Sequence, residues 1–156
     1  MSLANDCQGL ESLPLKLMIV AIVAALSILP AAEALSTLKN RDFLQRAESQ
    51  LDRIASAAES LAIAGPGNVR TISVDLSSEG PTKFSRLVVG DSPNSSNASA
   101  LVLELSSGSR MIRTLENPPA CLTSSEGGPL EISMPIFRVR MTVTAGQNWL
   151  IVVEAS

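Results

Sequence analysis

The sequence predicts an α+β protein: a long N-terminal helix, hydrophobic at first and amphipathic later, followed by a small antiparallel β-sandwich or curled sheet. Three observations support this class. Residues 17–32 read LMIVAIVAALSILPAA and carry no charge. Residues 36–64 contain neither glycine nor proline and are rich in helix-forming residues. From residue 69 onward the apolar positions alternate along short segments, which is the period of a β-strand.

The composition argues against several functional classes. The 156-residue chain has a net charge of −3 and no histidine, so it lacks the commonest general base and transition-metal ligand. Aromatic residues make up 3% and no basic patch is interleaved with them, which argues against nucleic-acid binding. Cys7 and Cys121 do not have the spacing of a metal site. Because no nucleotide-binding or catalytic motif is present, we expect no catalytic residue, no metal, no cofactor and no small-molecule substrate.

The apolar run has three interpretations. A spanning helix needs roughly 20 apolar residues; this run is short and contains Pro30, which a membrane helix tolerates better than a soluble one. A removable secretory signal would be cut after Ala34 and would release the β domain. A buried core helix would need a larger surrounding domain than the remaining chain provides. We expect a retained helix, with residues 10–35 as its membrane or filament-core segment.

The residues just before the run carry a family resemblance. Gln8-Gly9-Leu10-Glu11 places a glycine before an apolar residue and an early glutamate, and Pro14 and the apolar helix follow. This arrangement resembles the N-terminus of archaeal type IV pilin-like proteins, which carry a class III signal peptide. The resemblance implies that a prepilin peptidase cuts after Gly9, removing residues 1–9 as a leader and leaving Leu10 as the new N-terminus. It also implies a filament of many copies.

Glu11 would be the second residue of the processed chain. A carboxylate beside an apolar helix is costly in a membrane unless it is paired. The resemblance implies that this glutamate forms a salt bridge with the free N-terminal amine of a neighbouring subunit. The other interpretation is a charge at the membrane interface that stays hydrated.

Residues 36–64 form the predicted amphipathic extension of the helix, which Gly65-Pro66-Gly67-Asn68 ends. Apolar positions recur in it at heptad spacing, which predicts one continuous seam. The seam consists of Leu44, Ala47, Leu51, Ile54, Ala58 and Leu61. It packs on the β domain of its own chain, or it meets neighbouring copies in a bundle or filament, and the two interpretations are compatible.

Residues 69–156 form the predicted β domain. Residues 117–129 are expected to be a long loop because they hold Pro118, Pro119 and two glycines. Arg138 and Arg140 share the polar face of one expected strand, and Arg110 and Arg113 are candidate neighbours. We interpret this face as solvated, with cross-strand charge pairs, and the functional alternative is contact with an acidic polymer or the cell envelope. The expected strands are residues 69–76, 84–90, 100–105, 110–115, 130–134, 137–144 and 149–154.

Asn94 and Asn97 each begin an Asn-x-Ser sequon in the polar loop 91–99. The sequons predict N-glycosylation of a loop outside the cell, and the other interpretation is an ordinary serine- and asparagine-rich loop. Basic residues are denser after the apolar run than before it, so the positive-inside rule alone would place the C-terminal part in the cytoplasm. We expect the opposite orientation, with an extracellular β domain, because the tail is short and the sequons lie downstream.

Three functions are therefore open. The leading hypothesis is a structural pilin-like subunit, major or minor, of a cell-surface filament, whose helix first lies in the membrane and then packs against other copies. The second is a non-polymerising single-pass envelope protein whose extracellular β domain binds a surface-layer or machine component. The third is a secreted β domain released by a signal peptidase after Ala34.

Overall fold

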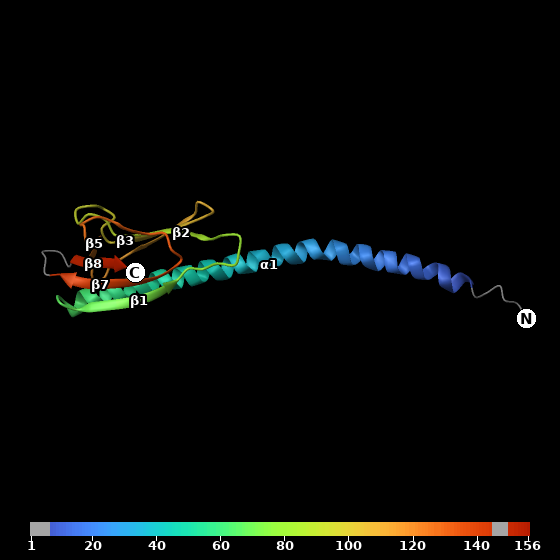
Figure 1. Cartoon of the computed structure of the whole chain (residues 1–156), viewed down its shortest axis with the longest axis horizontal. Coiled ribbons are helices and arrows are strands. Elements are labelled where there is room, and N and C mark those ends of the chain that lie inside the picture. Colours follow the sequence, from blue (N-terminus) through green and yellow to red (C-terminus); the bar gives the residue numbers. More distant parts are fainter. Residues whose placement is uncertain (1–6, 145–149) are drawn as a thin grey trace, which may run out of the picture. The chain divides into compact units, whose positions relative to one another are not determined.

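The computed structural model describes residues 7–144 and 150–156, with side chains described from Pro14 onward. The chain divides into two compact units, Met1–Lys39 and Asn40–Ser156. Within the described residues one helix and eight strands follow each other along the chain (Figure 1). The chain is therefore α+β, with a long N-terminal helix followed by β-sheet. The elements are α1 (Cys7–Ala64), β1 (Val69–Asp75), β2 (Phe84–Val89), β3 (Ala100–Leu105), β4 (Arg110–Thr114), β5 (Cys121–Ser124), β6 (Leu130–Ile132), β7 (Ile136–Thr144) and β8 (Leu150–Ala155).

Helix α1 spans 58 residues and contains both Pro14 and Pro30. It begins at Cys7, before the apolar run, and ends at Ala64 as expected. A proline removes one hydrogen bond of the helical ladder without ending the helix when the flanking turns hold it. The apolar run and the amphipathic extension are thus parts of one helix.

The end of α1 uses the residues that the sequence predicts. Gly65 is left-handed (φ 85°), and its amide donates to the carbonyl of Leu61 at 3.1 Å. The Nδ2 of Asn68 donates to the carbonyls of Ala64 at 2.9 Å and Gly65 at 3.0 Å. The bonds to Leu61 and Ala64 satisfy carbonyls that the last turn of a helix leaves without an internal partner.

The strands form two four-stranded sheets. Sheet A has the order β1-β7-β8-β5, and sheet B has the order β4-β3-β2-β6. Neighbouring strands are antiparallel except for β5 and β8, which run parallel, so the expected antiparallel domain is in fact mixed. Strand β5 also corrects the expectation that residues 117–129 form only a loop.

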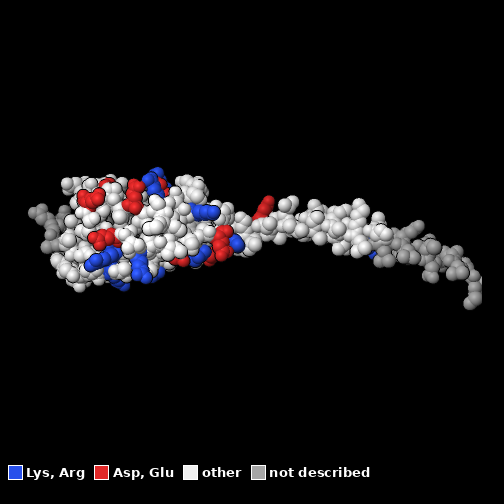
Figure 2. Space-filling view, in the orientation of Figure 1, with Lys and Arg blue, Asp and Glu red and all other residues white. Residues whose placement is uncertain are grey.

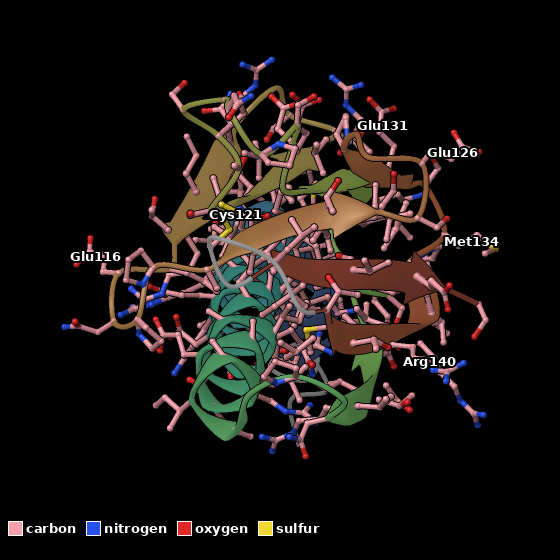
Figure 3. The ribbon with its side chains drawn as sticks, turned by 90° about the vertical axis from the view of Figure 1, so that its left-hand side faces the viewer. Glu116, Cys121, Glu126, Glu131, Met134 and Arg140 are labelled. Atoms are coloured by element: carbon pink, nitrogen blue, oxygen red, sulfur yellow. The ribbon has the colours of Figure 1, made fainter. Side chains whose placement is uncertain are left out.

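Both sheets and residues 43–62 of α1 contribute to one hydrophobic core. The helix contributes Phe43 and Ile54, and the sheets contribute strand residues such as Leu103 and Val139, all at most 2% exposed. Figure 3 looks along the helix and shows the strands beside it. The second half of α1 is therefore an integral part of the β domain's fold.

Helix α1 lies next to an edge strand of each sheet. Asp52 Oδ1 is 3.1 Å from Arg113 Nε of β4, the edge of sheet B. On the side of sheet A, Ser56 and Ala57 of α1 line one groove together with Ile72 of β1. A helix beside an edge strand is one of the ways in which a sheet is kept from pairing with another chain.

Candidate membrane and assembly helix

The first part of α1 is an exposed apolar surface. Every residue from 14 to 39 is exposed. Large aliphatic side chains stand out in this part, among them Leu17 (68% exposed), Leu26 (69%) and Leu29 (70%). Figure 2 shows that this part of the helix is almost free of charge. By length and composition alone, α1 is long and apolar enough to cross a membrane.

The hydroxyl groups in this segment bond within the helix. Ser27 Oγ donates to the carbonyl of Val23 at 2.8 Å, and Thr37 Oγ1 donates to the carbonyl of Glu33 at 2.9 Å. A polar side chain in hydrocarbon must find a hydrogen-bond partner inside the protein, and these two have one. The two hydroxyls are therefore compatible with apolar surroundings.

Two opposite charges flank the apolar run. Lys16 and Glu33 are the charged residues between positions 14 and 38, and both side chains are exposed. The sixteen residues between them rise about 24 Å, somewhat less than the roughly 30 Å hydrocarbon core of a bilayer. Long charged side chains reach toward the headgroups when their backbone lies slightly inside the membrane. In a bilayer the two charges would lie near opposite interfaces.

The predicted processing residues lie where side chains are outside the described part. Gly9, Leu10 and Glu11 belong to α1 by their backbone, and the structure describes no side chain before Pro14. Cleavage after Gly9 and an intersubunit salt bridge of Glu11 therefore stay predictions.

The predicted seam lies within the C-terminal unit and faces the β domain of the same chain. Ala47, Leu51, Ile54, Ala58 and Leu61 are 0–5% exposed, and Leu44 packs against the core that they join. The buried face is wider than the seam, since it also includes Phe43, Ala55, Ala57 and Ala62. In this fold the five buried seam residues are not available to a second copy, so assembly contacts of this half of α1 would have to use its other faces.

The sequon loop presents its asparagines to solvent. Asn94 and Asn97 are both exposed and lie in turns between β2 and β3. Asp91 organises the loop, because its carboxylate accepts from Ser95 Oγ at 2.6 Å and from the Ser92 amide at 2.7 Å. These two hydrogen bonds lower the pKa of Asp91. Glycosylation of the loop stays a prediction.

A charge cluster links the four strands of sheet B. Glu104 of β3 lies between two arginines, with Oε2 2.6 Å from Arg86 Nε of β2 and Oε1 2.9 Å from Arg110 Nε of β4. Arg86 Nη1 is also 3.6 Å from Glu131 Oε2 of β6. The hydrogen bond from Arg86, with further contributions from both arginine charges, lowers the pKa of Glu104. The sequence did not indicate this cluster, because it depends on which strands are neighbours.

Glu104→Gln is expected to lower the midpoint of thermal unfolding at pH 7. It removes a carboxylate whose ionised form is stabilised by the two arginines in the folded protein. The lowered pKa places this contribution above pH 4.5, the ordinary value of the group, and it fades as the pH falls through the folded pKa. Thermal unfolding from pH 7 down to pH 3 should show the two midpoints converging. The control is Glu126→Gln in an exposed turn (Figure 3); a constant difference across the range would contradict the electrostatic origin.

The other arginines do not join into one basic patch. Arg138 and Arg140 lie on β7 of sheet A, and Arg140 is directly opposite Glu154 of β8. Arg110 and Arg113 lie on β4 of sheet B, where each has its own carboxylate partner. Arg110 and Arg113 therefore do not share the strand face of Arg138 and Arg140, because β4 and β7 belong to different sheets.

Within the described ranges, no group of three or more histidine, cysteine, aspartate or glutamate side chains is placed to hold a metal ion. Cys121 of β5 is partly exposed, and its Sγ is 3.9 Å from the carbonyl of Pro93. Comparison of the chain with models of known families, with curated proteins and with solved structures finds no match.

Proposed function

We propose that this chain is a structural, pilin-like subunit of a cell-surface filament. One observation carries the proposal: a single helix has two kinds of surface along its length. Residues 17–32 are uncharged, largely apolar and exposed throughout, whereas the buried face between Phe43 and Ala62 belongs to the core of the β domain. An exposed apolar surface of this size is stable only in lipid or against other apolar surfaces.

The apolar segment would lie first in the membrane and later in a filament core. The apolar segment first holds the chain in the membrane, with the β domain outside the cell. After a prepilin peptidase removes residues 1–9, the same segment leaves the lipid and packs against other copies. Burial of each large aliphatic side chain contributes about 1.5–3 kcal/mol relative to water. A filament core would provide this burial in place of lipid, so the segment is not exposed to water in either environment. Assembly needs no reaction at the chain itself, and the proposal includes no enzyme activity.

A second candidate function is supported by the flanking charges. Lys16 and Glu33 would lie near opposite interfaces of a bilayer, which also suits a helix that stays in lipid. The chain would then be a non-polymerising single-pass envelope protein, whose β domain contacts another envelope component.

Shearing of surface filaments from cells that produce the full chain tests the two candidates. We expect the wild type in the filament fraction, and Gly9→Val in the membrane fraction because a peptidase that cuts after glycine cannot process it. Gln8→Ala keeps the glycine and is the control, expected to assemble like the wild type. Electron microscopy and peptide mass spectrometry would identify the chain. Confinement of the wild type to the membrane would overturn the filament proposal and support the single-pass anchor.

A further inference from the structure

The two charges that flank the apolar run carry an inference about how copies are arranged, and this inference rests on the proposed function. Lys16 and Glu33 have opposite signs and lie seventeen positions apart, from 16 to 33. At 1.5 Å per residue this separation is about 25 Å along the helix. Both side chains are exposed, and no other charge lies between positions 14 and 38.

Removal of the helix from lipid changes what these charges meet. In a bilayer each charge stays hydrated near an interface. In a filament core the same charges are surrounded by apolar side chains, where an unpaired ion costs several kcal/mol. Parallel copies packed side by side in register would place Glu33 beside Glu33 and Lys16 beside Lys16. Like charges at close range disfavour that register.

A shift of one parallel copy by seventeen positions removes both the unpaired charges and the like-charge contacts. It brings Lys16 of one copy level with Glu33 of the other, and an opposite charge within about 4–6 Å favours the ionised form of each group. We propose that in the assembled filament Lys16 of one copy pairs with Glu33 of a neighbouring copy. The pair sets an axial offset of about 25 Å between these two copies. The occupant of this surface is therefore a second copy of the chain.

Charge reversal tests the pairing in the full chain. Lys16→Glu and Glu33→Lys should each lower the yield of sheared filaments by at least about tenfold, because each creates a like-charge contact in the core. The double variant restores opposite charges and should recover the wild-type yield to within about twofold. Glu126→Lys makes the same change of charge on an exposed turn and should assemble normally. Carbonate extraction of membranes would check that every variant is still inserted.

Cysteine cross-linking tests the direction and the offset. In a chain with Cys7 and Cys121 replaced by serine, one tagged copy would carry Lys16→Cys and a differently tagged copy Glu33→Cys. We expect a short bifunctional reagent to join these two copies in filaments. Two copies that both carry Glu33→Cys should not be joined. Joining of two Ala24→Cys copies would indicate either a parallel pair in register or an antiparallel pair centred on the run, and either arrangement would overturn the proposed offset.

The failures of the two proposals are distinguishable. Absence of wild-type filaments would overturn the proposed function and this inference with it. Normal filaments from either single charge variant, or a double variant that assembles no better than the singles, would overturn only the pairing. Recovery in the double variant together with the joining of positions 16 and 33 would support both.

Discussion

Gly90→Ala is expected to destabilise the C-terminal unit by about 3 kcal/mol or more, because it combines a strained backbone with a steric overlap. Gly90 follows β2, is buried, and has φ 62°, in the left-handed region. A Cβ at this position would lie 2.5 Å from the carbonyl carbon of Leu122 and closer still to its oxygen. The neighbouring backbone is held in place, since the Asp91 amide donates to that oxygen at 3.1 Å and the Leu122 amide donates to Ala98 at 2.7 Å.

Thermal unfolding of the full chain in detergent, followed by circular dichroism, measures this loss. Gly108→Ala is the matched control, because Gly108 is also left-handed (φ 81°) but a Cβ there meets no atom within 4 Å. Gly108→Ala should lower the free energy of unfolding by only about 1–2 kcal/mol, because a residue with a Cβ is strained in the left-handed conformation. Equal losses in the two variants would contradict the close approach between Gly90 and β5.

Ile54→Ala is expected to cost about 2–5 kcal/mol, the range for truncation of a large buried aliphatic side chain. Ile54 belongs to the predicted seam and is 1% exposed, in the core that α1 shares with the two sheets. Its truncation would leave a cavity at this junction. The result would identify the seam as part of the fold of each single copy.

Ile63→Ala is the control on the same helix, because Ile63 is 73% exposed. It should change the stability by no more than about 0.5 kcal/mol. The same unfolding measurement compares the two variants. Equal stabilities of Ile54→Ala and the wild type would mean that the seam does not hold the helix to the sheets, and the seam would again be open to neighbouring copies.

Strands with strict alternation were predictable from the sequence. In β7, Phe137, Val139 and Met141 are buried while Arg138 and Arg140 between them are exposed, as a half-buried strand requires. Strand β5 has no such signal. It has four residues, and its central Leu122 and Thr123 are both buried, so no period of two is visible. Its parallel pairing with β8 also depends on contacts far apart in sequence.

The candidate helix was partly predictable, because some of its signals are local in the sequence. The apolar run and the Gly65 end are local signals, and the structure contains both in one helix. The heptad spacing of Leu51 and Ala58 indicated a buried face but not what buries it, because a seam looks the same whether its partner is a sheet or another copy. The bonds of Glu104 to two arginines could not be predicted, since strand order is not written in any short stretch of sequence.

Determination of the mature N-terminus tests most directly whether the apolar helix is retained and whether the chain is cut after Gly9. Intact-mass and N-terminal peptide mass spectrometry would be applied to the chain recovered from sheared filaments and from membranes. The pilin-like account predicts that the chain in filaments begins at Leu10, after the loss of residues 1–9. A chain that begins at Leu35 would contradict it, because the apolar helix would then be a discarded signal and no membrane or filament segment would remain.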